Sequence, residues 1–205
     1  MGSREVRGWR RVGPGLYSAD LSRQGFRDYR FRELFLRGAR QVLARHPNRD
    51  PKSPLTGGML YVAATAPKER TSFHYRAGEV PWERWGDRSK AEVNLYPYNC
   101  WDHNIIRIAD VDSETRTATL RYPVAGSIQI GNRYFIQNVR GALDAPCEWF
   151  CDRRTGVLWF RPPDGRIPRD GDVTVPMVEN LIELSGKPGA PIRDVRIEGD
   201  RKSVV

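Results

Sequence analysis

The stretch EWFCDRRTGVLWF, residues 148–160, decides the class of fold of this 205-residue sequence. Two short runs rich in aromatic residues flank the tetrapeptide Arg153-Arg-Thr-Gly156. A short hairpin loop requires a residue with positive φ, and Gly156 supplies one without a steric penalty. Pro162 and Pro163 then end the second run. We therefore expect a β-hairpin here.

The same two-residue period of polar and apolar residues dominates the middle of the chain, and this period is typical of β-strands. Residues 110–115 have the composition of a hairpin turn. Single helical turns are expected after Pro81 and within residues 138–143. The expected strands are Glu92–Tyr96, Asn104–Ala109, Thr117–Tyr122 and Arg133–Gln137.

Nearer the N-terminus, residues 32–37 and 40–45 predict a second hairpin, turning at Arg37-Gly38. Near the C-terminus, the short β-branched runs 173–175, 181–184 and 195–197 are separated by Gly and Pro turns. Strands at this interval resemble the rungs of a parallel β-helix. Only about one rung is present, whereas a solenoid needs roughly three repeats to bury a core. This shortfall suggests a truncated chain.

Composition excludes several classes of protein. The three cysteines are too few for a disulfide scaffold. The most apolar stretch, residues 60–66, is far shorter than the roughly 20 residues of a membrane span. The net charge of +9 is concentrated in residues 1–50, where twelve arginines face five acids. Such a patch can bind phosphate, but these arginines alternate with aromatic and acidic residues, as on the solvated face of a strand.

Several segments carry a family resemblance. Residues 33–48, 133–160 and 175–199 contain the motifs ELFLRG with ARHPN, RYFIQNV with LDAPCEWFCDRRTGVLWF, and LIELSG with PIRDVRIEG. Together they resemble the N-terminal part of bacterial right-handed parallel β-helix proteins of glycoside hydrolase family 141 and its relatives. The resemblance spans residues 4–199 and is most specific over residues 133–199. Two departures are Cys147, where the family usually has Gly, and Arg37, where Asn is common.

The resemblance implies an all-β fold. Residues 1–165 would form a β-rich, sandwich- or barrel-like insertion domain, and residues 166–199 the first rung of the right-handed β-helix. The family's catalytic residues lie on later rungs, so no catalytic residue is assigned, and the chain alone is expected to be inactive. The parent protein would be secreted or periplasmic and would hydrolyse glycosidic bonds in a polysaccharide.

The termini also favour a fragment. Residues 200–205, DRKSVV, do not continue the family pattern and match the translation of a common sequencing-library adapter. We expect this tail to be non-native and the natural sequence to end near Gly199. Met1 stands where the family has an internal segment, so a signal peptide and the first turns of the β-helix are expected to precede it.

Aromatic residues in the central loops are the candidates for carbohydrate contact. Sugar rings stack on exposed aromatic faces, and carboxylates bond their hydroxyl groups. Burial in the core is the competing interpretation for these side chains. Trp82 and Trp85 lie in a polar loop and are expected to be the best exposed. The full candidate set is Trp82, Trp85, Tyr98, Trp101 and Asp102.

Other chemistry is less favoured. Glu148 and Asp152 would lie roughly 13 Å apart along one strand, outside the separations that glycosidases use; we expect Glu148 to hold the turn at residues 144–146. Cys100, Asp102 and His103 lack the further ligands of a zinc site, and residues 110–114 lack the Gly and distal Glu of a calcium loop. No metal or cofactor is expected.

The sequence therefore leaves three hypotheses about function. The first is a non-catalytic domain fragment that caps the solenoid of a carbohydrate-active protein and lines its glycan groove, with polysaccharide reached through the parent protein. The second is a self-standing carbohydrate-binding module. The third, less favoured, is a basic nucleic-acid-binding domain that uses residues 4–49. No membrane partner is expected.

Overall fold

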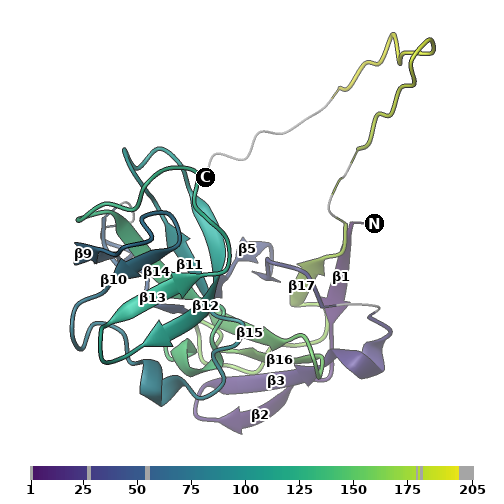
Figure 1. Ribbon diagram of the computed structural model, residues 1–205. Coiled ribbons are helices and arrows are strands. Elements are labelled where there is room, and N and C mark those ends of the chain that lie inside the picture. Colours follow the sequence, from purple (N-terminus) through teal and green to yellow (C-terminus); the bar gives the residue numbers. More distant parts are fainter. Residues whose placement is uncertain (1, 27–28, 54–55, 179, 181, 199–205) are drawn as a thin grey trace.

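Three β-sheets make up the regular structure of this protein in its computed structural model, which describes residues 2–26, 29–53, 56–178, 180 and 182–198. The sheets form two lobes (Figure 1). The terminal lobe combines the described residues of 2–44 and 143–177, and the inserted lobe is formed by those of 45–142. Each lobe has its own hydrophobic cluster. The expected all-β class is confirmed.

The terminal lobe packs two sheets on one core. This core buries Val6, Leu21, Trp149, Phe160 and Val173. Residues of both sheets contribute to it, so the arrangement is sandwich-like. The four-stranded sheet has the order β1 (Ser3–Val6), β17 (Val173–Pro176), β4 (Phe35–Leu36) and β5 (Ala39–Arg40), and the five-stranded sheet has the order β2 (Arg10–Gly13), β3 (Leu16–Asp20), β16 (Val157–Phe160), β15 (Glu148–Asp152) and β6 (Val42–Leu43).

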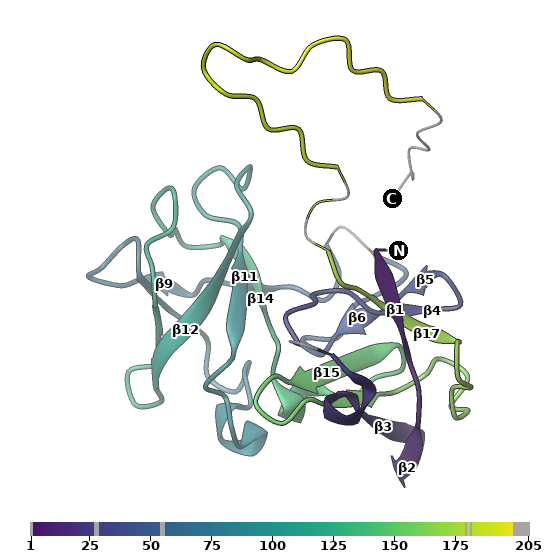
Figure 2. The same cartoon turned by 90° about the vertical axis from the view of Figure 1, so that its right-hand side faces the viewer.

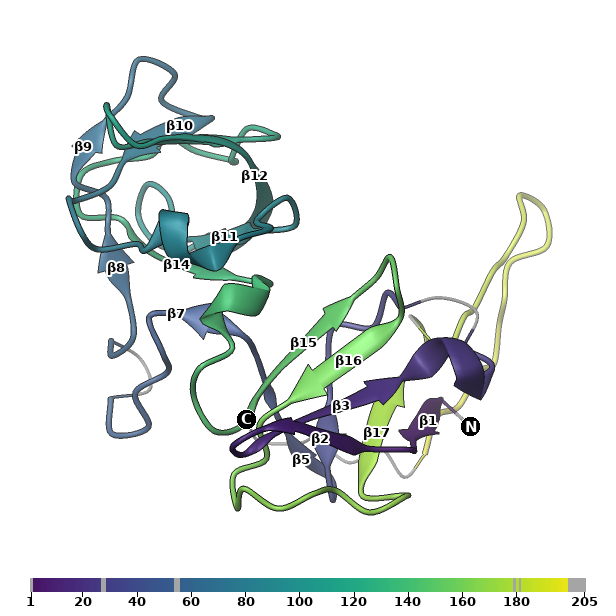
Figure 3. The same ribbon diagram turned by 90° about the horizontal axis from the view of Figure 1, so that it is seen from below.

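The inserted lobe is a single curled sheet of eight strands. Seen from below, it wraps around its own core (Figure 3). Val93, Leu95, Tyr134 and Ile136 alternate inward along two neighbouring strands and are buried. The strands run in the order β7 (Arg45–His46), β14 (Arg133–Gln137), β11 (Glu92–Leu95), β12 (Asn104–Asp112), β13 (Thr117–Leu120), β10 (Ser72–His74) and β9 (Ala64–Thr65), while β8 (Leu60–Tyr61) also pairs with β14.

Most of the expected local elements are confirmed. The hairpin over residues 148–160 forms as β15 and β16, and Gly156 has φ +74°. The strands β11 and β14 and the β12–β13 hairpin form as expected, except that β12 extends to Asp112, three residues into the segment expected to be the turn. The expected helical turns are 3₁₀ turns, η2 (Trp82–Trp85) and η3 (Arg140–Ala142); a further one, η1 (Leu21–Gln24), follows β3.

The hairpin expected over residues 32–45 is shorter than predicted. Its turn is correct, because Arg37 and Gly38 both have positive φ, as a two-residue type I′ turn requires. Only Phe35–Leu36 and Ala39–Arg40 pair, however. Val42–Leu43 instead runs parallel to β15 in the other sheet, where the amide of Val42 bonds the carbonyl of Cys147 at 2.9 Å. The free edge of β15 offers backbone hydrogen-bonding groups to Val42–Leu43, and the local sequence pattern of residues 40–45 does not reveal this distant partner.

A β-helix rung is not seen in the described residues of the range 166–199. Residues 173–176 form β17, which pairs antiparallel with β1 and β4 and so completes a sheet of the terminal lobe. From residue 178 the described chain extends away from both lobes (Figures 1 and 2), with a single backbone bridge between Lys187 and Ala190. A rung is stabilised by its neighbours. The run that begins at residue 181 and the tail 200–205 fall partly or wholly outside the described residues.

Cys147 carries a left-handed backbone, with φ +71°. Its amide bonds the carbonyl of Arg161 at 2.7 Å and its carbonyl accepts from Val42, so neighbouring strands fix this conformation. Left-handed geometry costs a residue with a Cβ roughly 1–2 kcal/mol. A glycine at this position would avoid that cost.

We predict that Cys147→Gly stabilises the protein by about 1 kcal/mol, because glycine removes the steric cost of positive φ. Urea denaturation of the wild type and the variant measures the difference. Ala145→Gly is the matched control: Ala145 is not among the residues with positive φ, so this change should destabilise by about 0.5–1 kcal/mol. Equal destabilisation by both changes would contradict the strain at Cys147.

Candidate functional site

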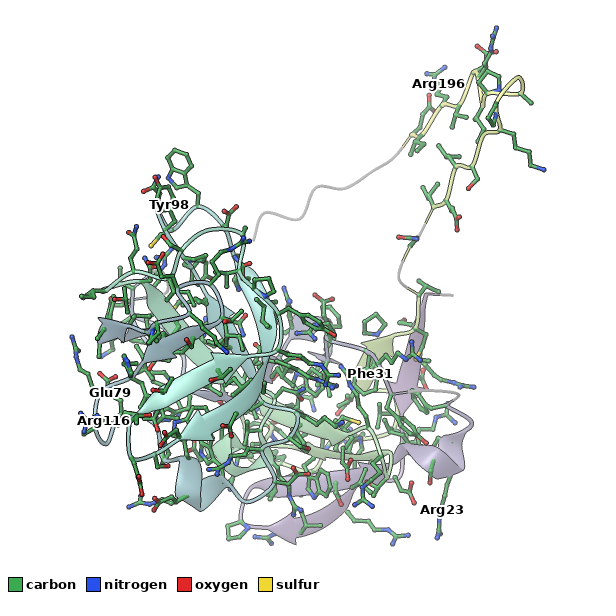
Figure 4. All side chains as sticks on the ribbon, viewed as in Figure 1. Arg23, Phe31, Glu79, Tyr98, Arg116 and Arg196 are labelled. Carbon is green, nitrogen blue, oxygen red and sulfur yellow. The ribbon has the colours of Figure 1, made fainter. Side chains whose placement is uncertain are left out.

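Residues 97–103 form an exposed loop between β11 and β12, here called the aromatic loop. Trp101 is 88% exposed and Tyr98 is 54% exposed. Asp102, which follows Trp101, is also exposed. Figure 4 shows Tyr98 at the outer tip of the inserted lobe. Three of the five predicted contact residues, Tyr98, Trp101 and Asp102, are thus brought together on one loop.

Backbone contacts hold the aromatic loop in place. The amide of Tyr98 bonds the carbonyl of Ser127 at 3.0 Å, and Asn132 Nδ2 donates to the carbonyl of Tyr98 at 3.0 Å. The amide of Cys100 closes a turn onto the carbonyl of Pro97 at 2.9 Å. Tyr98 and Cys100 both have positive φ. Non-glycine residues keep this conformation only where their surroundings impose it, and such strain clusters at functional sites.

A stack of side chains supports the base of the loop. The rings of Tyr96 and His103 are parallel, with centroids 4.6 Å apart, and the guanidinium of Arg133 lies 4.5 Å from the Tyr96 centroid. His103 Nε2 lies 2.9 Å from Asn94 Oδ1. Burial, together with the charge of Arg133, lowers the pKa of His103. The imidazole is therefore a neutral positioning group near pH 7.

The expected exposure of Trp82 and Trp85 is wrong. They are only 4% and 5% exposed. In the 3₁₀ turn η2, residues three apart project from the same face, and here that face packs on the core: the two indoles meet edge to face at 5.2 Å, and Trp85 also contacts the His46 ring. Their aromatic faces are unavailable to a sugar, and the polar residues around them mark only the outer face of the turn.

The two carboxylates of β15 are engaged in turns. Glu148 is 2% exposed and accepts the amides of Asp144 and Ala145 at 3.1 Å each and that of Arg45 at 3.3 Å. The expectation that it holds the turn at residues 144–146 is confirmed. Asp152 accepts the amide of Arg154 at 2.8 Å and so closes the β15–β16 hairpin.

The remaining candidates are also held by local contacts. The thiol of Cys100 lies 3.4 Å from the carbonyl of Tyr96, and the three cysteines are free. Asp112 accepts the amides of Glu114 and Thr115, which confirms a hairpin turn at this position. No group of three or more potential metal ligands occurs among the residues that the structure describes.

Sequence analysis missed a polar surface on the sheet of the inserted lobe. Glu92 and Asn94 on β11 point away from that lobe's core, and across the strands Asn94 lies opposite Ile105 and Phe135, while Glu92 lies opposite Gln137. This face and the terminal lobe line a groove of about 920 Å³, here called the inter-lobe groove. The alternation of residues 92–96 predicts a strand, but it does not reveal that every residue of β11 is buried.

An ion pair between the half-exposed Arg32 and the buried Glu92 links the two lobes beside this groove. Arg32 of the terminal lobe donates to both carboxylate oxygens of Glu92, at 3.1 and 2.8 Å, and Gln137 donates to Glu92 at 3.0 Å. Burial acts to raise the pKa of Glu92, but these hydrogen bonds hold that pKa below its ordinary value. Glu92 is therefore charged at neutral pH and anchors Arg32.

Comparison with solved structures agrees with this architecture. One solved structure, titled "Glycoside hydrolase", superposes with a TM-score of 0.72 at 22% sequence identity, over 93% of this chain and 34% of that one. The chain shares the fold of part of a glycoside hydrolase. It spans about a third of that structure's length. No family model and no curated protein matches the sequence.

The described part of the chain also lacks any helix long and apolar enough to cross a bilayer.

We predict that Glu148→Gln destabilises the protein by about 1–3 kcal/mol, since the amide group replaces an acceptor that faces a buried backbone N–H. Denaturant unfolding measures this, with the exposed Glu114→Gln as the control.

Burial raises the pKa of Glu148 from 4.5 to about 7, against the opposing effect of its three N–H donors. The folded state thus binds an extra proton between these values.

The pH dependence follows from that proton. The contribution of Glu148 to stability is fully present below about pH 4.5 and declines as the pH rises to about 7. The difference in unfolding free energy between wild type and Glu148→Gln should therefore shrink over this interval. A difference that grows with pH would contradict a raised pKa.

Proposed function

We propose that this chain is a non-catalytic, β-rich part of a larger carbohydrate-active protein, a glycoside hydrolase of the family 141 type. The superposition carries this proposal, since it covers nearly all of this chain but leaves about two thirds of the glycoside hydrolase unmatched. The carboxylates of β15 also support a non-catalytic role, because both are engaged in turns. Hydrolysis would then be performed outside these residues, in a secreted or periplasmic parent.

In this proposal, the β-rich domain runs beyond the expected boundary at residue 165 and includes β17, and the segment after β17 leads into a right-handed parallel β-helix. The extended segment after β17 supports the second part, because its apolar side chains are exposed. Exposed apolar strands need a partner surface. Further rungs would bury them, and the terminal lobe would cap the open end of the solenoid. The residues concerned are Val178, Ile182, Leu184, Ile192, Val195 and Ile197.

The aromatic loop is the proposed contact with glycan. An indole that is almost fully exposed offers a flat apolar face to a sugar ring, while the nearby carboxylate of Asp102 can accept hydrogen bonds from hydroxyl groups. A loop held by its backbone in a fixed conformation presents these groups at little entropic cost. Polysaccharide is the proposed partner.

A self-standing carbohydrate-binding module is the second candidate, and the exposure of Trp101 favours it as well. The two functions differ in how the isolated chain binds glycan. A self-standing module would bind glycan by itself. A domain that forms one side of a larger groove would bind weakly until the β-helix forms the other side. Nucleic-acid binding is less well supported, because arginines of residues 4–49 form ion pairs, as Arg7 does with Glu5, Arg37 with Asp172 and Arg40 with Glu33.

We predict that Trp101→Ala weakens binding of neutral oligosaccharides by roughly three- to tenfold, as the loss of one stacking contact of about 0.5–1.5 kcal/mol implies. Titration calorimetry with xylohexaose and cellohexaose measures the change. Tyr122→Ala, which removes an exposed aromatic side chain outside the aromatic loop, should leave affinity unchanged. Identical binding by wild type and Trp101→Ala would remove the loop from the glycan surface.

We also predict that the purified chain does not hydrolyse aryl glycosides. Assays against a panel of nitrophenyl glycosides, with a mock purification as the control, measure this. Turnover that follows the protein through purification and exceeds the mock would overturn the non-catalytic assignment.

A further inference from the structure

We propose that the inter-lobe groove binds an acidic segment of a glycan, with its arginines taking the carboxylates of uronate residues and its buried amides taking hydroxyl groups. This inference deepens the proposed function and rests on it, since it assumes a glycan ligand. It concerns a surface that shares only His103 with the aromatic loop. The volume of about 920 Å³ falls within the usual range of ligand clefts.

The charge of the groove is the first argument. Five arginines line it, and Glu33 is the one acidic residue among the described residues of the lining. Arg40 is paired with Glu33 at 2.9 Å and Arg32 with Glu92 at 2.8 Å. Beside these two pairs, Arg45 and Arg49 add further positive charge to the groove. Planar guanidinium groups match the geometry of a carboxylate, which they can bind through two parallel hydrogen bonds.

Arg45 and Arg49 concentrate this charge at one end. Arg45 is buried; its Nε donates to the carbonyl of Pro47 at 3.0 Å and its Nη2 to that of Gly58. Burial, with the nearby charge of Arg49, lowers the pKa of Arg45 to about 10 against the opposing effect of the Glu148 carboxylate, so Arg45 remains charged at neutral pH. Two neighbouring cations repel each other, and an anion bound between them relieves that repulsion.

Unpaired amide atoms are the second argument. Asn94 is 2% exposed, and its Nδ2 has no hydrogen-bond partner, although its Oδ1 faces His103. Gln41 is also buried, and its Oε1 has no partner. Both residues line the groove. A buried polar atom without a partner costs about 1–3 kcal/mol, and a sugar hydroxyl can both donate to Gln41 and accept from Asn94.

The aromatic lining favours a sugar acid over a nucleic acid. Single-stranded nucleic acids need exposed aromatic faces on which bases stack. Phe135 and Phe31 line the groove but are buried. The guanidinium of Arg45 covers Phe135 at 3.6 Å, and Phe31 stacks on Trp149 at 5.6 Å. Among the described residues of the lining, neither phenylalanine offers a free face to a base.

Calorimetric titration of the full chain with hexagalacturonate, with cellohexaose as the neutral counterpart, tests the proposal. We expect hexagalacturonate to bind more tightly than cellohexaose. The double variant Arg40→Gln/Arg49→Gln should lose about tenfold in affinity for hexagalacturonate, as the loss of charge-assisted hydrogen bonds implies, and keep its affinity for cellohexaose. Arg10→Gln/Arg166→Gln, which removes two exposed arginines outside the groove, should bind like the wild type.

Gln41→Leu, which removes an unpaired acceptor of the groove and keeps the net charge, provides an independent variant and should also weaken hexagalacturonate binding. Equal losses in both arginine pairs would show diffuse electrostatic attraction and overturn the proposal, as would tighter binding of an oligothymidylate than of hexagalacturonate. Loss of binding on Trp101→Ala but not on the groove changes would refute the groove and leave the proposed function standing. No binding of either sugar by the wild type would count against both.

Discussion

The buried carboxylate of Glu148 fixes both points at which the chain passes between the lobes. One oxygen accepts the amide of Arg45, where the chain leaves the terminal lobe, and the other accepts the amides of Asp144 and Ala145, where it returns. Two backbone hydrogen bonds extend the same junction: the amide of Ala44 donates to the carbonyl of Trp149, and the carbonyl of Ala44 accepts from the amide of Asn138. The inserted lobe is therefore tied to β15 at its base, and the face it turns toward the terminal lobe follows from that attachment.

Because of that attachment, the terminal lobe packs against the polar face of the sheet in the inserted lobe. Glu92 and Asn94 would be ordinary solvent-facing residues on an isolated sheet, but here Arg32 from the terminal lobe pairs with Glu92. Because the Glu92 carboxylate is buried, loss of Arg32 would be costly, and Asn94 beside it is enclosed with an amide nitrogen that has no hydrogen-bond partner. The inter-lobe groove is thus lined by residues from four separate parts of the chain, within 30–49, 94–105, 135–137 and 176–178. The aromatic loop depends mostly on contacts within the inserted lobe.

Local sequence predicted local structure well. Gly156 and the Arg37-Gly38 pair marked hairpin turns correctly, because positive φ is a property of one or two residues. The role of Glu148 also followed from its spacing to the turn at 144–146. Val42–Leu43 and Val173–Pro176 were harder, since a short apolar run can join any sheet that offers an open edge. Their partners lie more than one hundred residues away in sequence.

The sequence by itself determined the all-β class, most strands, and the resemblance to glycoside hydrolases, which the superposition supports at the level of fold. These properties reside in residue period, turn residues and short motifs. Only the tertiary structure decided which aromatic residues are exposed: Trp82 and Trp85 lie in a polar segment yet face the core, while Trp101 faces solvent. Exposure and the inter-lobe groove depend on what packs against each surface, and that packing is set by distant segments rather than by neighbours in sequence.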